Sequence, residues 1–129
     1  MKVQPFLMFE GKCEEAMTFY VSLISGSKAV DIVRFGPGEP GAEGSVRHAS
    51  FVIGGQTIRC VDSPVKHAFT FTPASSLFVD CDSEADIDRL AGALSDGGQF
   101  LMPLGNYGFS RKFAWLNDRY GVSWQINLA

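Results

Sequence analysis

Apolar and polar residues alternate along the chain in a pattern that predicts two successive halves with the same order of elements. In the first half, apolar residues recur at helical spacing from Glu14 onward, and Gly26 lies where a helix would stop. Gly54-Gly55, between two alternating runs, predicts a tight hairpin. The predicted strands of this half are residues 3–9, 29–35, 46–53 and 56–61, and the apolar helix face is Ala16, Phe19, Tyr20, Leu23 and Ile24.

The second half repeats this order of elements. Ser83 and Asp86 resemble a capping box, which marks the start of a helix, and Gly97-Gly98 ends that helix. The predicted strands are residues 75–81, 99–102, 109–116 and 122–128, and the apolar helix face is Ile87, Leu90, Ala91 and Leu94. Each half therefore reads strand–helix–strand–strand–strand.

This repeat predicts the fold class and the domain organisation. We expect an α+β fold in which two βαβββ modules form a curled mixed sheet, with the helices outside and a concave pocket inside. The chain is then a single domain, residues 1–129, made of repeat 1 (1–62) and repeat 2 (74–129). Its 129 residues suffice for one core. Concave surfaces of this kind are where small molecules bind.

Composition and charge argue against several classes of protein. The 11 basic and 14 acidic residues give a net charge of −3 without a basic cluster, which argues against nucleic-acid binding. No apolar run approaches the roughly 20 residues that span a bilayer. Met1 leads into strand-like sequence rather than a basic and apolar leader, so we expect the protein in the cytoplasm. Cys13, Cys60 and Cys81 cannot all pair and are expected as free thiols there.

Several segments of the chain match a family pattern, and the last of them is the most specific. They are residues 9–11, 14–17, 19–23, 51–56, 69–71, 76–81 and 115–126. On these residues the chain resembles the PhnB-like family, often labelled 3-demethylubiquinone-9 3-methyltransferase-like. That family lies in the vicinal-oxygen-chelate superfamily of glyoxalase, bleomycin-resistance and dihydroxybiphenyl dioxygenase proteins. The resemblance implies the same glyoxalase-like fold and a homodimer.

The resemblance also implies where a metal would bind, namely on the first and last strand of each module. Counting from the helices and turns places these positions at Pro5, Arg59, Ser76 and Gln125. Pro5 has no side-chain ligand atom, and Arg59 is a permanent cation. Ser76 is a poor ligand, and Gln125 alone cannot hold a divalent ion. We therefore expect no metal and no cofactor, although a shift of one residue would send the opposite set of side chains to this face.

Alternation from the same four positions predicts which residues line the pocket. The opposite set, including Phe6, Met8, Leu77, Val79, Trp124 and Ile126, should face the helices as core. The predicted lining is apolar and aromatic with a few polar groups, as is usual for small-molecule sites. It consists of Pro5, Leu7, Phe9, Thr57, Arg59, Ser76, Phe78, Asp80, Trp115 and Gln125. Trp115 fits either the pocket wall or a contact between subunits.

Arg59 is the sharpest candidate for ligand binding, because a guanidinium in a half-closed pocket seeks an anionic group. Alternatively it pairs with Asp80 or another local carboxylate, or extends to solvent. Asp80 could act as a general base or only cap a turn. His48 and His67 lie at no metal-ligand spacing and read as surface or locally hydrogen-bonded residues. Tyr107 fits a gate over the pocket or an ordinary loop aromatic.

These features predict a protein that binds a small organic molecule, anionic if Arg59 contacts it. The first alternative is an enzyme of the superfamily, of lyase, isomerase or dioxygenase type or, by family label only, a 3-demethylubiquinone methyltransferase. No glycine-rich G-x-G-x-x-G turn follows a strand, so the methyl-donor site of a doubly wound sheet is not indicated. A second alternative is an interaction protein whose sheet supports dimerisation. No catalytic residue is assigned.

Overall fold

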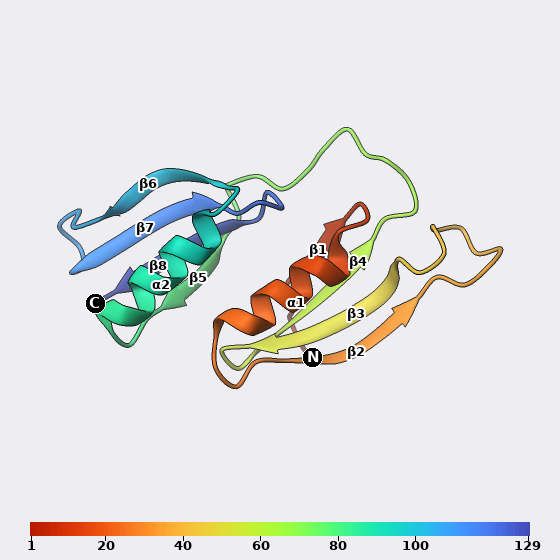
Figure 1. Cartoon of the computed structure of the whole chain (residues 1–129), viewed down its shortest axis with the longest axis horizontal. Coiled ribbons are helices and arrows are strands. Elements are labelled where there is room, and N and C mark those ends of the chain that lie inside the picture. The colour runs from red at the N-terminus through yellow and green to blue at the C-terminus, as the bar shows by residue number, and fades with distance from the viewer. The chain divides into compact units, whose positions relative to one another are not determined.

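A computed structural model describes all residues, 1–129. The chain divides into module 1 (Met1–His67) and module 2 (Ala68–Ala129), with the division between the two predicted repeats. Each module contains one four-stranded sheet with its own helix across one face (Figure 1). Neither helix combines the length and the apolar composition that crossing a membrane requires.

In module 1, the first strand of the chain lies beside the last strand of the module. The sheet order is β1-β4-β3-β2, with β1 parallel to β4 and the other pairs antiparallel. Phe6 of β1 lies opposite Arg59 of β4. The elements are β1 (Phe6–Phe9), α1 (Cys13–Leu23), β2 (Lys28–Arg34), β3 (Val46–Ile53) and β4 (Gln56–Asp62).

Module 2 has the same topology, with the sheet order β5-β8-β7-β6. Here β5 is parallel to β8, and Phe78 lies opposite Gln125. The elements are β5 (Leu77–Asp80), α2 (Glu84–Ser95), β6 (Gln99–Gly105), β7 (Lys112–Asn117) and β8 (Ser123–Leu128). The predicted α+β class with two βαβββ modules is therefore confirmed, whereas the concave pocket stays a prediction.

Helix α1 forms because its apolar residues recur on one side, and a carboxylate from β4 caps its start. Its buried residues are Cys13, Ala16, Met17, Tyr20 and Leu23. No side chain of the preceding Lys12 caps the helix. Instead, the buried Asp62 carboxylate accepts hydrogen bonds from the backbone N–H groups of Gly11 (2.8 Å) and Cys13 (3.0 Å). This replaces the local cap that helix N-termini normally use.

Helix α2 follows the sequence prediction closely. The Ser83 hydroxyl accepts a hydrogen bond from the Asp86 N–H at 3.2 Å, which confirms the predicted cap. The buried residues are Ile87, Leu90, Ala91 and Leu94, the predicted apolar face. They pack on β7 and β8, where Trp124, Ile126 and Leu116 are almost fully buried. The predicted core positions in β8 are thus confirmed.

The hairpin between β3 and β4 turns at Gly54-Gly55, as predicted. Both residues have positive φ, 54° and 80°. Such a two-residue turn matches the twist of the flanking strands, and glycine adopts it without a steric penalty.

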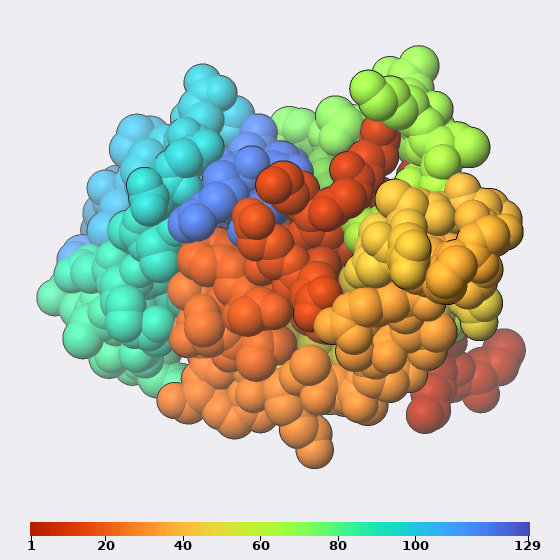
Figure 2. Space-filling model, turned by 45° about the vertical axis from the view of Figure 1, so that its right-hand side comes forward, coloured from red at the N-terminus to blue at the C-terminus, as the bar shows by residue number.

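Three strand boundaries differ from the sequence prediction by three residues, more than any of the others. β1 begins at Phe6, and Figure 2 shows the first residues (dark red, lower right) projecting from the surface. β6 continues through Pro103 to Gly105; it pairs only with β7, and an edge strand tolerates a residue without an N–H. β7 starts at Lys112, because Tyr107 and Phe109 belong to a loop that packs on Phe113.

Candidate functional site

The face of the module 1 sheet turned away from α1, here called open face 1, carries a group of polar and charged side chains. Arg59 is exposed between the buried residues Ile58 and Cys60 of β4, so it points away from the helix. Phe6, its partner in β1, lies on the same face, with the Arg59 guanidinium carbon 5.8 Å from the ring centroid. Open face 1 is therefore a place where a cation and an exposed aromatic ring meet.

His48 of β3 and Asp31 of β2 complete this group. Arg59 Nη2 is hydrogen-bonded to His48 Nε2. His48 Nδ1 lies 3.9 Å from Asp31 Oδ2, and the Ser50 hydroxyl donates to Asp31 Oδ1 at 2.6 Å. The row Arg59–His48–Asp31 thus crosses three neighbouring strands.

The predicted alternation in β1 is wrong by one residue. Leu7 and Phe9 were expected beside Arg59, but they lie opposite the buried Cys60 and Asp62 and face α1. Phe6 and Met8, expected as core, share the face of Arg59 and Val61. The count treated Phe19 of α1 and Leu90 of α2 as equivalent landmarks, but Leu90 belongs to the buried face of its helix and Phe19 does not.

Two further predicted lining residues of module 1 lie next to Arg59. Thr57 is two residues before it on β4 and is half-buried on the same face. Pro5 contributes its backbone carbonyl, which accepts the Arg59 N–H at 2.9 Å and extends the pairing of β1 with β4. Their role in binding a ligand stays a prediction.

The corresponding face of module 2, open face 2, carries the predicted residues on the predicted side. Ser76 and Ser123 are joined through their hydroxyls at 2.7 Å. Gln125 Nε2 donates to the Ser76 hydroxyl at 3.3 Å, and Trp115 Nε1 donates to that of Ser123 at 2.9 Å. These four side chains form one hydrogen-bonded cluster on a single face of the sheet.

An aromatic cluster lies on the same face of module 2. Phe109 and Phe113 meet edge to face with their ring centroids 4.9 Å apart, and Phe78 lies 6.4 Å from Phe113. Tyr107 stacks on Phe109, and its hydroxyl donates to the Pro103 carbonyl. The loop therefore covers Phe113, which is only 4% exposed, while Phe78 and Phe109 stay open to solvent.

Asp80 is exposed at the end of β5 and accepts a hydrogen bond from Asn127 Nδ2 at 3.1 Å. A neutral amide supports the charged carboxylate without relaying a proton. This contact fits a local structural role better than general-base chemistry.

The four positions implied for a metal do not offer a suitable donor set. Neither Pro5 nor Phe6, which replaces it on the face of Arg59, has a side-chain ligand atom. Ser76 and Gln125 are hydrogen-bonded to each other. No group of three or more His, Cys, Asp or Glu side chains could hold a metal ion. These residues do not fit a divalent cation.

Comparison with protein families decides the classification. The model of the 3-demethylubiquinone-9 3-methyltransferase family matches residues 1–127. The chain belongs to this PhnB-like family. A comparison with curated proteins finds no match.

Solved structures agree with this membership. The PhnB-like chain is 56% identical to a putative 3-demethylubiquinone-9 3-methyltransferase, PhnB protein, from Bacillus cereus, covering 100% of both chains with a TM-score of 0.98. It is 30% identical to a protein from Pseudomonas aeruginosa, covering 99% of this chain and 97% of that one, with a TM-score of 0.80.

A more distant solved structure has the same fold. It is a glyoxylase/bleomycin resistance protein/dioxygenase domain from a Frankia species, 18% identical, covering 100% of this chain and 92% of that one, with a TM-score of 0.65. The resemblance to the PhnB-like family and the glyoxalase-like fold is thus confirmed.

The cysteines of the PhnB-like chain are free thiols in packed surroundings. Cys13 and Cys60 are fully buried, and the hydrogen bond to Cys60 together with burial raises the pKa of Cys13. Burial, followed by the nearby carboxylates of Asp86 and Asp82, raises the pKa of Cys81 to about 11. A nucleophilic cysteine needs a lowered pKa, so neither Cys13 nor Cys81 fits that role.

We expect Cys81 to react slowly with iodoacetamide at pH 8. With a pKa of about 11, the thiolate fraction is roughly one in a thousand at that pH, so alkylation should be on the order of a hundredfold slower than for free cysteine. The rate should rise about tenfold per pH unit up to about pH 10. Mass spectrometry with Cys81→Ser as the control measures this, and a rate equal to that of free cysteine would contradict it.

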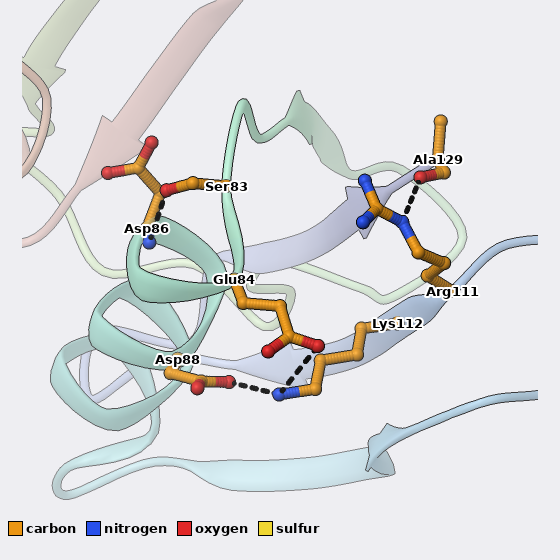
Figure 3. A network of polar contacts seen from close by, with 7 residues as sticks. All are labelled: Ser83, Glu84, Asp86, Asp88, Arg111, Lys112 and Ala129. Atoms are coloured by element: carbon orange, nitrogen blue, oxygen red, sulfur yellow. Dashed lines mark hydrogen bonds and ion pairs between the residues drawn. The ribbon is translucent and has the colours of Figure 1, made fainter.

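On the helix side of module 2, Lys112 ties β7 to α2. Its ammonium lies 2.9 Å from the Asp88 carboxylate and 3.9 Å from that of Glu84 (Figure 3). The hydrogen bond to Asp88 raises the pKa of Lys112. Arg111 points elsewhere, and its Nε donates to the main-chain oxygen of Ala129 at 2.7 Å (Figure 3). These contacts join β7 to α2 and the residue before β7 to the C-terminal residue of the chain.

The sequence analysis missed two buried carboxylates and one pairing. Asp62, described above, and Asp118, in the turn between β7 and β8, are 4% and 3% exposed. Asp118 precedes Gly121 in a turn-like stretch, so its role could have been anticipated. Nothing local marks Asp62, and the contact of Arg59 with His48 depends on β3 lying beside β4.

Proposed function

We propose that this PhnB-like protein binds a small anionic organic molecule through Arg59 on open face 1. One observation carries the proposal: Arg59 has no carboxylate within ion-pair distance, and its side-chain contacts are a histidine and a phenyl ring. Each of the other five arginines is bound to an acceptor: Arg34 to Glu14, Arg47 to Glu39, Arg89 to Asp86, Arg119 to Asp96, and Arg111 to the Ala129 main-chain oxygen.

The chemistry of open face 1 supports this proposal. A guanidinium presents donors in a planar fork that matches carboxylate and phosphate oxygens. Phe6 is 55% exposed beside it and supplies an apolar surface for the organic part of a ligand. An anionic head and a small apolar body are therefore the ligand features that this site suits.

Arg59→Ala should weaken binding of small anions at least tenfold without unfolding the protein. We would titrate the protein with benzoate and with inorganic phosphate, following backbone amide shifts by NMR and the fold by circular dichroism. A tenfold loss corresponds to about 1.4 kcal/mol, close to the lower end of the about 1.5–3 kcal/mol that is typical of one charge-assisted hydrogen bond.

Two variants control this test. Arg59→Lys keeps the charge but not the fork and should retain part of the affinity. Arg111→Ala removes an arginine elsewhere and should leave binding unchanged. Equal affinity in the protein and in Arg59→Ala would contradict the proposal.

The proposal includes the loss of the superfamily metal site. It is supported by the donor set, since Arg59 itself occupies one of the implied positions and would repel a cation. Enzymatic activity, including the methyltransferase activity of the family label, stays an open alternative for which no catalytic residue is assigned. Each module is a four-stranded sheet with one helix, unlike the doubly wound sheet that commonly binds nucleotide-type cofactors.

We further propose that the protein is a cytoplasmic homodimer that does not bind nucleic acid. The homodimer follows only from the family resemblance, and the cytoplasmic location and the absence of nucleic-acid binding follow only from sequence. On open face 2, Ser76, Phe78, Asp80, Trp115 and Gln125 keep their status as proposed ligand-contacting residues. Apart from the Asp80 carboxylate, these residues would present hydroxyl, amide and aromatic groups to a ligand.

A further inference from the structure

We propose that Arg59 and His48 form a proton-linked anion site, in which His48 takes up a proton when a carboxylate or similar small oxyanion binds between the two side chains. The inference rests on the proposed function, because Arg59 is the primary anion contact in both. It adds a second cation that exists only in the bound state.

The contact between the two side chains identifies the protonation state of His48 in the free protein. A guanidinium can only donate hydrogen bonds. His48 Nε2, which faces Arg59 Nη2, must therefore accept and carry no proton. The single N–H of the neutral ring is then at Nδ1, on the side of Asp31 Oδ2 at 3.9 Å.

Protonation at His48 Nε2 would turn this attractive contact into a repulsive one. A proton taken from solvent would make His48 a cation whose Nε2–H points at the N–H groups of Arg59, so the two side chains would repel each other. An oxyanion placed between them removes the conflict, since its oxygens accept from both cations. Anion binding and proton uptake therefore favour each other.

The charges around His48 support the same coupling. Asp31 on β2 and Arg59 on β4 face it from the two neighbouring strands, and on its own strand Arg47 pairs with Glu39 at 2.7 Å. In the free state the negative charge of Asp31 and the positive charge of Arg59 balance each other, and the imidazole between them is neutral. In the bound state one carboxylate balances the additional imidazolium, whereas protonation alone would leave one uncompensated charge.

This linkage fixes the direction of the pH dependence. Because binding takes up a proton at His48, lowering the pH favours the bound state. If one proton is taken up per anion bound, the affinity should rise by up to about tenfold for each unit that the pH falls. A carboxylate probe keeps its own charge between pH 5.5 and pH 8, because carboxyl groups titrate near pH 4.

The experiment is an NMR titration with benzoate between pH 5.5 and pH 8, with calorimetry in two buffers of different ionisation enthalpy to count protons. We expect tighter binding at low pH, uptake of one proton, and a shift of the His48 ring signals on binding. In His48→Gln, which keeps a polar side chain but cannot titrate, binding should persist without pH dependence. His67→Gln, which removes the other histidine, should behave as the unaltered protein.

The outcomes separate the two proposals. Benzoate binding that is lost in Arg59→Ala but independent of pH in the unaltered protein overturns the proton linkage and leaves the proposed function standing. A pH dependence that survives His48→Gln also overturns the linkage. Binding unaffected by Arg59→Ala overturns the proposed function itself.

Discussion

Replacing Asp62 by alanine should lower the free energy of unfolding by about 3–5 kcal/mol, the largest effect that we expect from a single substitution. The carboxylate is 4% exposed and accepts from three backbone N–H groups, those of Gly11, Cys13 and Val46, at 2.8, 3.0 and 2.9 Å. Alanine would leave three donors without a partner, and a buried unsatisfied donor costs about 1–3 kcal/mol. Urea unfolding followed by circular dichroism measures the loss.

Two substitutions calibrate this result. Asp62→Asn keeps one acceptor oxygen for Gly11 and Cys13 but points an amide N–H₂ at the Val46 N–H, so we expect roughly half of the alanine effect. Glu43→Ala removes an exposed carboxylate from the same module and should stay within about 0.5 kcal/mol of the unaltered protein. A loss in Asp62→Ala no larger than in Glu43→Ala would show that the carboxylate does not hold α1 and β3.

The second large effect should come from Asp118→Ala, at about 2–4 kcal/mol. Asp118 accepts from the Tyr120 and Val122 N–H groups at 2.8 and 3.1 Å and from Trp124 Nε1 at 2.9 Å. The change should therefore release both the turn and a core indole that is 1% exposed. Urea unfolding followed by tryptophan fluorescence measures the loss of stability and reports the change around the Trp124 indole.

A double-mutant cycle isolates the indole bond. Trp124→Phe removes the N–H donor, so in Asp118→Ala it should cost less than in the unaltered protein, with a coupling of about 1–2 kcal/mol. Trp115→Phe is the matched control, since Trp115 donates to Ser123 instead, and it should add to Asp118→Ala. Strict additivity of Asp118→Ala with Trp124→Phe would rule out the hydrogen bond as a stabilising contact.

The elements that could be predicted from sequence are those determined by local patterns. The buried face of α2, its Ser83 cap and the Gly54-Gly55 turn all depend on residues within a few positions of each other. The core side of β8 followed from simple alternation around Gln125. Such local signals predict elements well because each is read within one helix or one turn.

The features that the sequence did not predict depend on contacts between distant segments. The face of β1 was assigned by counting along the chain, and an error of one residue in that count inverts every side chain of a strand. Asp62 caps a helix whose first residue lies 49 positions earlier. In the candidate site, Arg59 was found from sequence, but its partners Phe6 and His48 required the register of three strands.

The shared topology of the two modules allows their open faces to carry different kinds of side chain. In each sheet the side chains beneath the helix keep an apolar pattern, while every second strand position is left for other chemistry. One copy uses those positions for ionisable groups, with Asp31, His48 and Arg59 in a row, and the other for hydroxyls, an amide and aromatic rings. A repeated unit can thus change the side chains on the open face of its sheet while the residues beneath the helix maintain the fold.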